Sequence, residues 1–256
     1  MFNKIKDISK KIENLSEDKN FLNMLVFFLF LMCLLLFLTE GIEKKDIGTA
    51  GLTLISTLAG ATAAFRLNEM KDKKNQFKND HAQLNIALFI IVNQLNALQN
   101  ILSRYEEYSS TNSKAFLMPA YNPPDYSNLF ISFEKISFIL FSSNPQILLK
   151  LTIQQDGFHH SIDAVRQRNK FYVEQVQPAF HNKELINKLA SPEEIKESIG
   201  LSIFNGAIQI AENSHELITQ IFNDTEILHD QILAIGRELF PGQKFVSGRL
   251  SKGQRK

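Results

Sequence analysis

Residues 66–105 read RLNEMKDKKNQFKNDHAQLNIALFIIVNQLNALQNILSRY, and this stretch decides the fold class. It belongs to a longer segment, from Phe65 to Pro119, in which neither glycine nor proline interrupts a helix. Hydrophobic residues recur every seven positions, which is typical of a helix that packs along other helices. The stripe faces either its own domain's core, which we favour, or another chain. Its two series are Met70, Phe77, Leu84, Ile91, Leu98 and Tyr105, and Leu88, Leu95 and Leu102.

The uncharged residues 47–65, IGTAGLTLISTLAGATAAF, lead directly into this stretch and are long enough to cross a bilayer. Small residues dominate them, so their own insertion free energy is marginal. Residues four apart share a helix face, and small residues there let another backbone approach closely while hydroxyls bond across the contact. The partner is either the first span of the same chain or a second chain. The predicted transmembrane packing face consists of Thr49, Thr53, Ser56, Thr57, Gly60, Ala61 and Ala64.

A first span is predicted at residues 21–38, FLNMLVFFLFLMCLLLFL. A helix of this length covers about 27 Å, close to the thickness of the hydrocarbon core. The only cysteine, Cys33, lies inside it, so no internal disulfide can form, and we interpret Cys33 as a small packing residue. Residues 21–65 are therefore predicted to form a two-helix transmembrane hairpin. Residues 1–20 precede it as an amphipathic cytoplasmic lead-in.

Positive charge gathers on both outer flanks of the predicted hairpin, whereas the short loop at 39–46 carries only Lys44 and Lys45. Because cytoplasmic flanks are enriched in lysine and arginine, both termini are predicted to lie in the cytoplasm. The sequence thus favours a two-pass membrane protein. The flanking charges are Lys4, Lys6, Lys10, Lys11 and Lys19 before the hairpin, and Arg66, Lys71, Lys73, Lys74 and Lys78 after it.

Residues 66–240 are predicted to form a cytoplasmic helical domain, so that the whole chain is all-α. The second span is expected to continue into the heptad-patterned helix. Ser191, Pro192 and Glu194 form a strong helix start, with an N-cap, a first-turn proline and a capping-box acid. The other expectations are a loop over 109–128, helices over 128–142 and 145–175 that end by Pro178, and a long helix with possible kinks at Gly200 and Gly206 that ends before Pro241.

Residues 241–256 are predicted to form a basic flexible tail. They contain no acidic residue and are free to meet anionic lipid or nucleic acid. Nucleic acid would therefore be bound only through this tail or through a partner. The basic residues of the tail are Lys244, Arg249, Lys252, Arg255 and Lys256.

No motif in the chain predicts a catalytic residue, a cofactor or a metal site. His159 and Asp163 lie four residues apart on a predicted helix, but one such pair without a further ligand is a weak metal signal. A polar stripe on the heptad-patterned helix is interpreted as a solvated face rather than a binding surface. It consists of Asn93, Gln94, Asn96, Gln99 and Asn100.

The two spans, the short loop, GATAAFRLNEMKDKK and NIALFIIVNQLNALQNIL together resemble uncharacterised bacterial two-transmembrane proteins. The architecture is also loosely similar to two-transmembrane effectors of anti-phage defence systems, including retron-encoded ones. That resemblance implies spans that disrupt the inner membrane once a cytoplasmic partner releases them, and it implies no site residues. Our leading hypothesis is a non-enzymatic membrane effector or sensor that binds a cytoplasmic protein or self-associates. The alternatives are a scaffold whose spans only tether it and, ranked last, an enzyme.

Overall fold

The computed structural model describes residues 31, 44–182 and 191–248, and all regular structure within these residues is helical. The chain divides into two units, residues 1–73 and 74–256, and helix α3 (Lys44–Glu106) contributes to both. The all-α prediction is therefore confirmed for the described residues. The elements are α3 (Lys44–Glu106), α4 (Thr111–Phe116), η1 (Phe133–Phe141), α5 (Ile147–Phe171), η2 (Tyr172–Val176), α6 (Gln177–Asn182), α7 (Pro192–Ile199) and α8 (Leu201–Leu239).

Helix α3 contains both the second predicted span and the heptad-patterned stretch, so their predicted continuity is confirmed. Among the described residues, one helical stretch, Ser56–Glu106, is long and apolar enough to cross a membrane. Its best 18-residue window has a mean hydropathy of 1.4, and half of that window is buried inside the protein. Such a stretch is compatible with a membrane span and equally with a core helix. The first predicted span, apart from the helical Leu31, and the lead-in at 1–20 lie outside the described residues.

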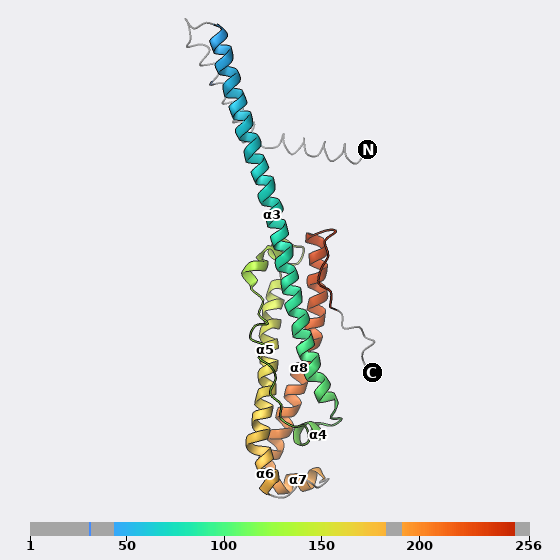
Figure 1. Ribbon diagram of the computed structural model, residues 1–256. Coiled ribbons are helices and arrows are strands. Elements are labelled where there is room, and N and C mark those ends of the chain that lie inside the picture. The colour runs from blue at the N-terminus through green and yellow to red at the C-terminus, as the bar shows by residue number, and fades with distance from the viewer. Residues whose placement is uncertain (1–30, 32–43, 183–190, 249–256) are drawn as a thin grey trace. The chain divides into compact units, whose positions relative to one another are not determined.

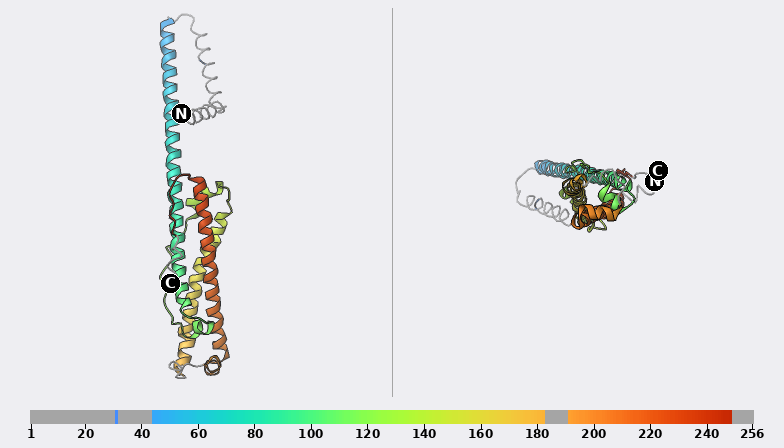
Figure 2. Two further views of the ribbon diagram at one scale, coloured as in Figure 1. Left: turned by 90° about the vertical axis from the view of Figure 1, so that its right-hand side faces the viewer. Right: turned by 90° about the horizontal axis from the view of Figure 1, so that it is seen from below.

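In the second unit, α5 and α8 run alongside the part of α3 that follows residue 74 (Figures 1 and 2). The heptad stripe of α3 faces this core, as predicted, because seven of its members are buried: Leu84, Leu88, Ile91, Leu95, Leu98, Leu102 and Tyr105. Phe77 lies at the edge of the core, where its ring meets that of Phe240 at 5.0 Å. Gly157 of α5 lets α8 approach closely, since an added Cβ would lie 2.5 Å from Cδ1 of Ile221. The stripe thus packs within the chain.

The segment between α3 and α5 is more ordered than the sequence predicted. Residues 109–128 contain the short helix α4, whose first turn is capped by the side chain of Ser110. The helix expected over 128–142 is instead the 3-10 helix η1, interrupted by Ile136 with a φ of −114°. The 3-10 form is common in short connecting pieces because it tightens the chain without needing a long run.

The prediction that α5 ends by Pro178 is wrong, because the helical path continues through η2 and α6 to Asn182. Proline lacks an N–H and its ring clashes with the carbonyl four residues earlier in a regular helix. Here the wider π-turn Tyr172–Val176 precedes it, and the N–H of Gln177 donates to the carbonyl of Tyr172. This local widening lets the chain carry Pro178 without leaving the helical path.

The capping box at Ser191 is confirmed, because Ser191 and Glu194 each accept the other's backbone N–H. Of the two glycines expected to kink the following helix, only Gly200 does so. Its φ of +85° separates α7 from α8. Gly206 lies within α8, where an added Cβ would stand 2.9 Å from Cζ of Phe171. Its small size therefore serves packing.

Helix α8 ends at Leu239, before Pro241 as predicted, but the next residues depart from the expected flexible tail. Residues 243–248, here called the C-terminal strap, lie along α3. The side chain of Asn85 accepts the N–H of Val246 at 2.8 Å, and Nε2 of His81 lies 3.0 Å from the carbonyl oxygen of Lys244. The ring of Phe245 packs edge-on against His81. These polar and ring contacts hold the strap, which the tail's basic composition alone would not predict.

Candidate functional site

The predicted transmembrane packing face lies on one side of α3 in the first unit. All seven of its residues (Thr49, Thr53, Ser56, Thr57, Gly60, Ala61 and Ala64) are exposed. Two of its hydroxyls bond within α3: Thr53 donates to the carbonyl of Thr49, and Thr57 to that of Thr53, each at 2.8 Å. In these two cases the hydroxyl donates to the carbonyl one turn earlier, and the predicted bonding across a helix contact stays a prediction. Such bonding satisfies a hydroxyl in an apolar medium without a partner helix.

Gly60 stands in the middle of this face, and no described atom lies within 4 Å of a Cβ added there. The same is true of Gly51, nine residues earlier. Because 3.6 residues make one turn, positions nine apart point to opposite sides of a helix. The two glycines therefore form a matched pair: one on the small-residue face and one opposite it, with equal room for a side chain.

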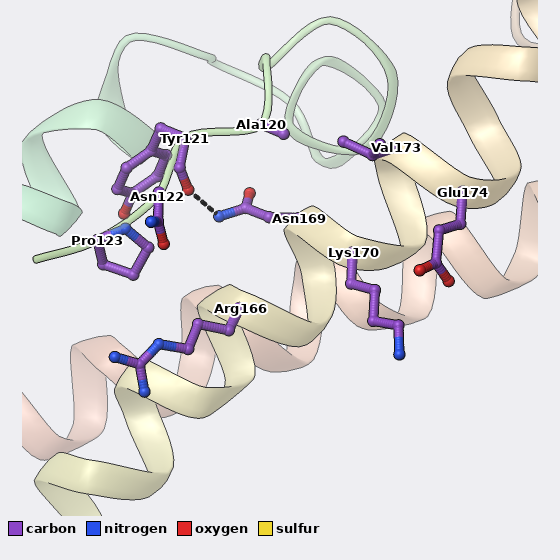
Figure 3. A pocket seen from close by; sticks show the side chains of 9 residues that line it. All are labelled: Ala120, Tyr121, Asn122, Pro123, Arg166, Asn169, Lys170, Val173 and Glu174. Atoms are coloured by element: carbon purple, nitrogen blue, oxygen red, sulfur yellow. Dashed lines mark hydrogen bonds between the residues drawn. The ribbon is translucent and has the colours of Figure 1, made fainter. Parts of the chain in front are cut away.

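A groove of about 370 Å³ opens in the second unit between the segment 120–123 and the last turns of α5 with η2. Figure 3 shows Tyr121, Asn122 and Pro123 on one side, and Arg166, Asn169 and Lys170 on α5. Asn169 fastens the two sides together by donating from Nδ2 to the carbonyl of Tyr121 at 2.5 Å. Most of the exposed lining of this open groove is apolar, and guanidinium, ammonium, amide and carboxylate groups supply the smaller polar part.

Arg168 holds the segment beside the groove in place. Its side chain is only 2% exposed, and its guanidinium donates to the carbonyls of Lys114 and Met118, at 2.5 Å each, and of Pro119 at 3.4 Å. The carbonyl of Lys114 belongs to the last turn of α4, where a helix leaves carbonyl groups unpaired, and those of Met118 and Pro119 follow the helix. The guanidinium also stands 4.9 Å from the ring centre of Tyr172. Desolvation by burial lowers the pKa of Arg168.

Tyr121 links this region to α3, because the guanidinium of Arg104 lies 4.6 Å from the centre of its ring. Its hydroxyl is buried and has no hydrogen-bond partner among the described residues. Burial accordingly raises the pKa of the Tyr121 phenol. Nε2 of His229 in α8 is likewise buried without a described partner.

The interpretation of the polar stripe on α3 as solvated is wrong for one member. Gln94 is 2% exposed and donates to the carbonyl of Leu129 at 2.9 Å. Gln155 of α5 binds the same segment from the other helix, because its side chain accepts the N–H of Ile131 at 2.6 Å. Both amides bond an irregular segment that has no helical partners of its own. The sequence did not indicate the roles of Gln155 and Arg168, because no local pattern shows which distant backbone segment a side chain will contact.

The other candidate residues remain apart. Asp163 pairs with Arg166 at 2.9 Å, and no group of three or more His, Cys, Asp or Glu residues suited to a metal occurs in the described part of the chain. Of the basic tail, Lys244 is exposed and belongs to the C-terminal strap. Arg249, Lys252, Arg255 and Lys256 lie outside the described residues.

Comparison with protein-family models, with curated proteins and with solved structures finds no match to this chain. Its function is therefore argued from the chain's own geometry.

Proposed function

We propose that this protein is a non-enzymatic effector or sensor of the bacterial inner membrane, in which the helical domain binds a protein partner and the two predicted spans respond. One observation carries the proposal. A single uninterrupted helix, α3, contains the exposed small-residue face and, further along, seven buried core residues of the helical domain. A helix without a break transmits a displacement along its axis, and switching helices commonly shift by about 1–2 Å.

The groove beside Tyr121 is the proposed partner site, and one of its lining residues contacts α3 directly. Arg104 of α3 stacks on Tyr121, and Asn169 binds the carbonyl of that same residue. Arg168 binds the carbonyls of Met118 and Pro119, which precede it in the chain. A partner that displaces the 120–123 segment would alter the packing of α3. The spans would respond by associating through the small-residue face, where close backbone approach is possible. A defence role, as the resemblance implies, is the setting that fits this mechanism.

Replacing Gly60 with leucine is expected to abolish association of the spans and any collapse of membrane potential on induced expression. The leucine has room on α3 itself, since no described atom lies within 4 Å of the added Cβ. It blocks only the close approach of another helix, and overpacking such a contact costs about 1–3 kcal/mol. Chemical crosslinking in native membranes measures association, and a potential-sensitive dye with growth curves measures the effect on the cell.

Gly51→Leu is the matched control, because it makes the same substitution on the opposite side of the same helix. Both leucines favour insertion, so loss of anchoring cannot explain a difference between them. Gly51→Leu should behave like the parent chain. If the parent itself leaves potential and growth unchanged while inserted, the effector proposal fails. The spans would then serve only as a tether.

Topology is tested by a reporter that is active only in the periplasm. Fused within residues 39–46 it should be active, and fused after Lys256 it should be inactive, because lysines flank the hairpin on its outer sides. Activity at the C-terminal fusion, or none within the loop, would contradict the two-pass arrangement with both termini in the cytoplasm.

A further inference from the structure

Helix α3 carries a second heptad series on the side away from the buried stripe. Its spacings alternate between four and three residues, which is the repeat of a coiled-coil seam. Every member lies in the second unit and is exposed or half-exposed, and the two large apolar members, Ile86 and Phe89, are 51% and 56% exposed. This outer seam consists of Asn75, Asn79, Ala82, Ile86, Phe89, Asn93, Asn96, Asn100 and Ser103.

The outer seam from Ala82 onward lies in an uncharged part of a surface helix, whereas its first two members, Asn75 and Asn79, stand among charged residues. Between Asp80 and Arg104, α3 has no Asp, Glu, Lys or Arg at all. A solvated helix face normally carries charged side chains, whereas depletion of charge distinguishes the core of a protein interface. Phe130, 56% exposed, extends the apolar part of the surface and lines a small groove with Ile86 and Ile90. The face has the composition of an interface rather than of a solvated surface.

We propose that the outer seam pairs with the same seam of a second copy of this chain, as a parallel two-helix contact. Self-pairing is favoured by chemistry, because an asparagine amide both donates and accepts and can bond its own equivalent across a two-fold axis. Ile86 and Phe89 would supply the apolar centre. The part of α3 that carries this centre has no charged residue of its own, and Lys135 lines the groove beside it. The parallel direction rests on the proposed function, since two copies anchored in one membrane enter it with the same orientation.

The several asparagines make this contact weak, so that it depends on how concentrated the two copies are. Polar residues at seam positions specify register and oligomeric state at a cost in stability. Anchoring both copies in one membrane raises their effective concentration, so a contact too weak to persist in dilute detergent can form there. Association through the outer seam would thus bring two helical domains together only where the chain is anchored.

Disulfide crosslinking in native membranes tests the pairing. In a background with Cys33→Ser, which removes the chain's only cysteine, Asn93→Cys and Asn100→Cys should each give a dimer on copper-phenanthroline oxidation. Equivalent seam positions face each other in a parallel pair. Ile227→Cys, on α8 and 58% exposed, is the matched control and should remain monomeric. Differently tagged copies establish that the product contains two chains of this protein.

Adding Phe89→Asp to the Asn93→Cys chain should remove the dimer, because it places two like charges at the contact. The inference is overturned if neither seam cysteine gives a dimer, if the product contains another protein, or if Ile227→Cys crosslinks equally. Protease resistance of the helical domain establishes that each variant is folded. Seam dimers in a chain that leaves membrane potential unchanged would support this inference while removing the proposed function. Depolarisation without seam dimers would do the reverse.

Discussion

Arg168→Met should lower the free energy of unfolding of the helical domain by about 3 kcal/mol, because it removes donors from the buried carbonyl of Met118 and the partly buried carbonyl of Lys114. Arg168 is almost fully buried and bonds the carbonyls of Lys114, Met118 and Pro119. An orphaned buried acceptor costs about 1–3 kcal/mol, and methionine offers no donor to replace the guanidinium. Removing a buried charge recovers some desolvation free energy, so the net loss is smaller than the sum of the lost bonds. A urea titration of the full chain in detergent, followed by circular dichroism, measures it.

Arg166→Met is the matched control on the same helix. Its guanidinium pairs with Asp163, but both side chains are largely exposed, at 44% and 57%. Exposed ion pairs contribute at most about 1 kcal/mol, so this variant should unfold close to the parent chain. Arg166 lines the groove beside Tyr121, whereas Arg168 binds the backbone of the segment beside that groove. Equal stability losses for the two variants would contradict a structural role for the buried guanidinium.

Phe158→Ala should be the most destabilising single truncation in α5, by about 3–5 kcal/mol. The side chain is fully buried, and its ring lies 6.0 Å from that of Tyr126 in an edge-to-face arrangement. Truncation removes favourable burial and leaves a cavity. Helices α5 and α8 are already in close contact at Gly157, so they cannot easily move together to close it. The same urea titration, together with faster exchange of backbone amides in α5 and α8, measures the effect.

Phe141→Ala makes the identical chemical change on the surface, because Phe141 is 88% exposed. It should alter stability by less than about 0.5 kcal/mol, as exposed substitutions usually do. A comparable loss at both positions would mean that burial at Phe158 does not determine stability. A loss at Phe158 alone confirms the core formed by α3, α5 and α8.

The sequence by itself determined the helical class, the long uninterrupted α3 and the inward direction of its heptad stripe. These features depend on local signals: the seven-residue repeat of Leu84, Ile91 and Leu98, and the lack of glycine and proline. The start of α7 at Ser191 was equally local, because a capping box is complete within four residues. Each signal lies within a few turns of the structure that it specifies, and so it can be read without knowing the rest of the fold.

Tertiary structure alone decided where the polar side chains and the irregular segments go. Gln94 and Arg168 have sequence neighbours like those of solvated residues, yet each bonds a backbone segment far away in the chain. The strap residues Phe245 and Val246 stand in a basic, glycine-rich context, but an apolar contact with α3 holds them. Local composition indicates only whether a residue by itself favours water or an apolar environment. Which unpaired carbonyl or apolar surface it meets is determined only when distant segments are packed together, because a buried polar group must find a partner wherever the fold leaves one.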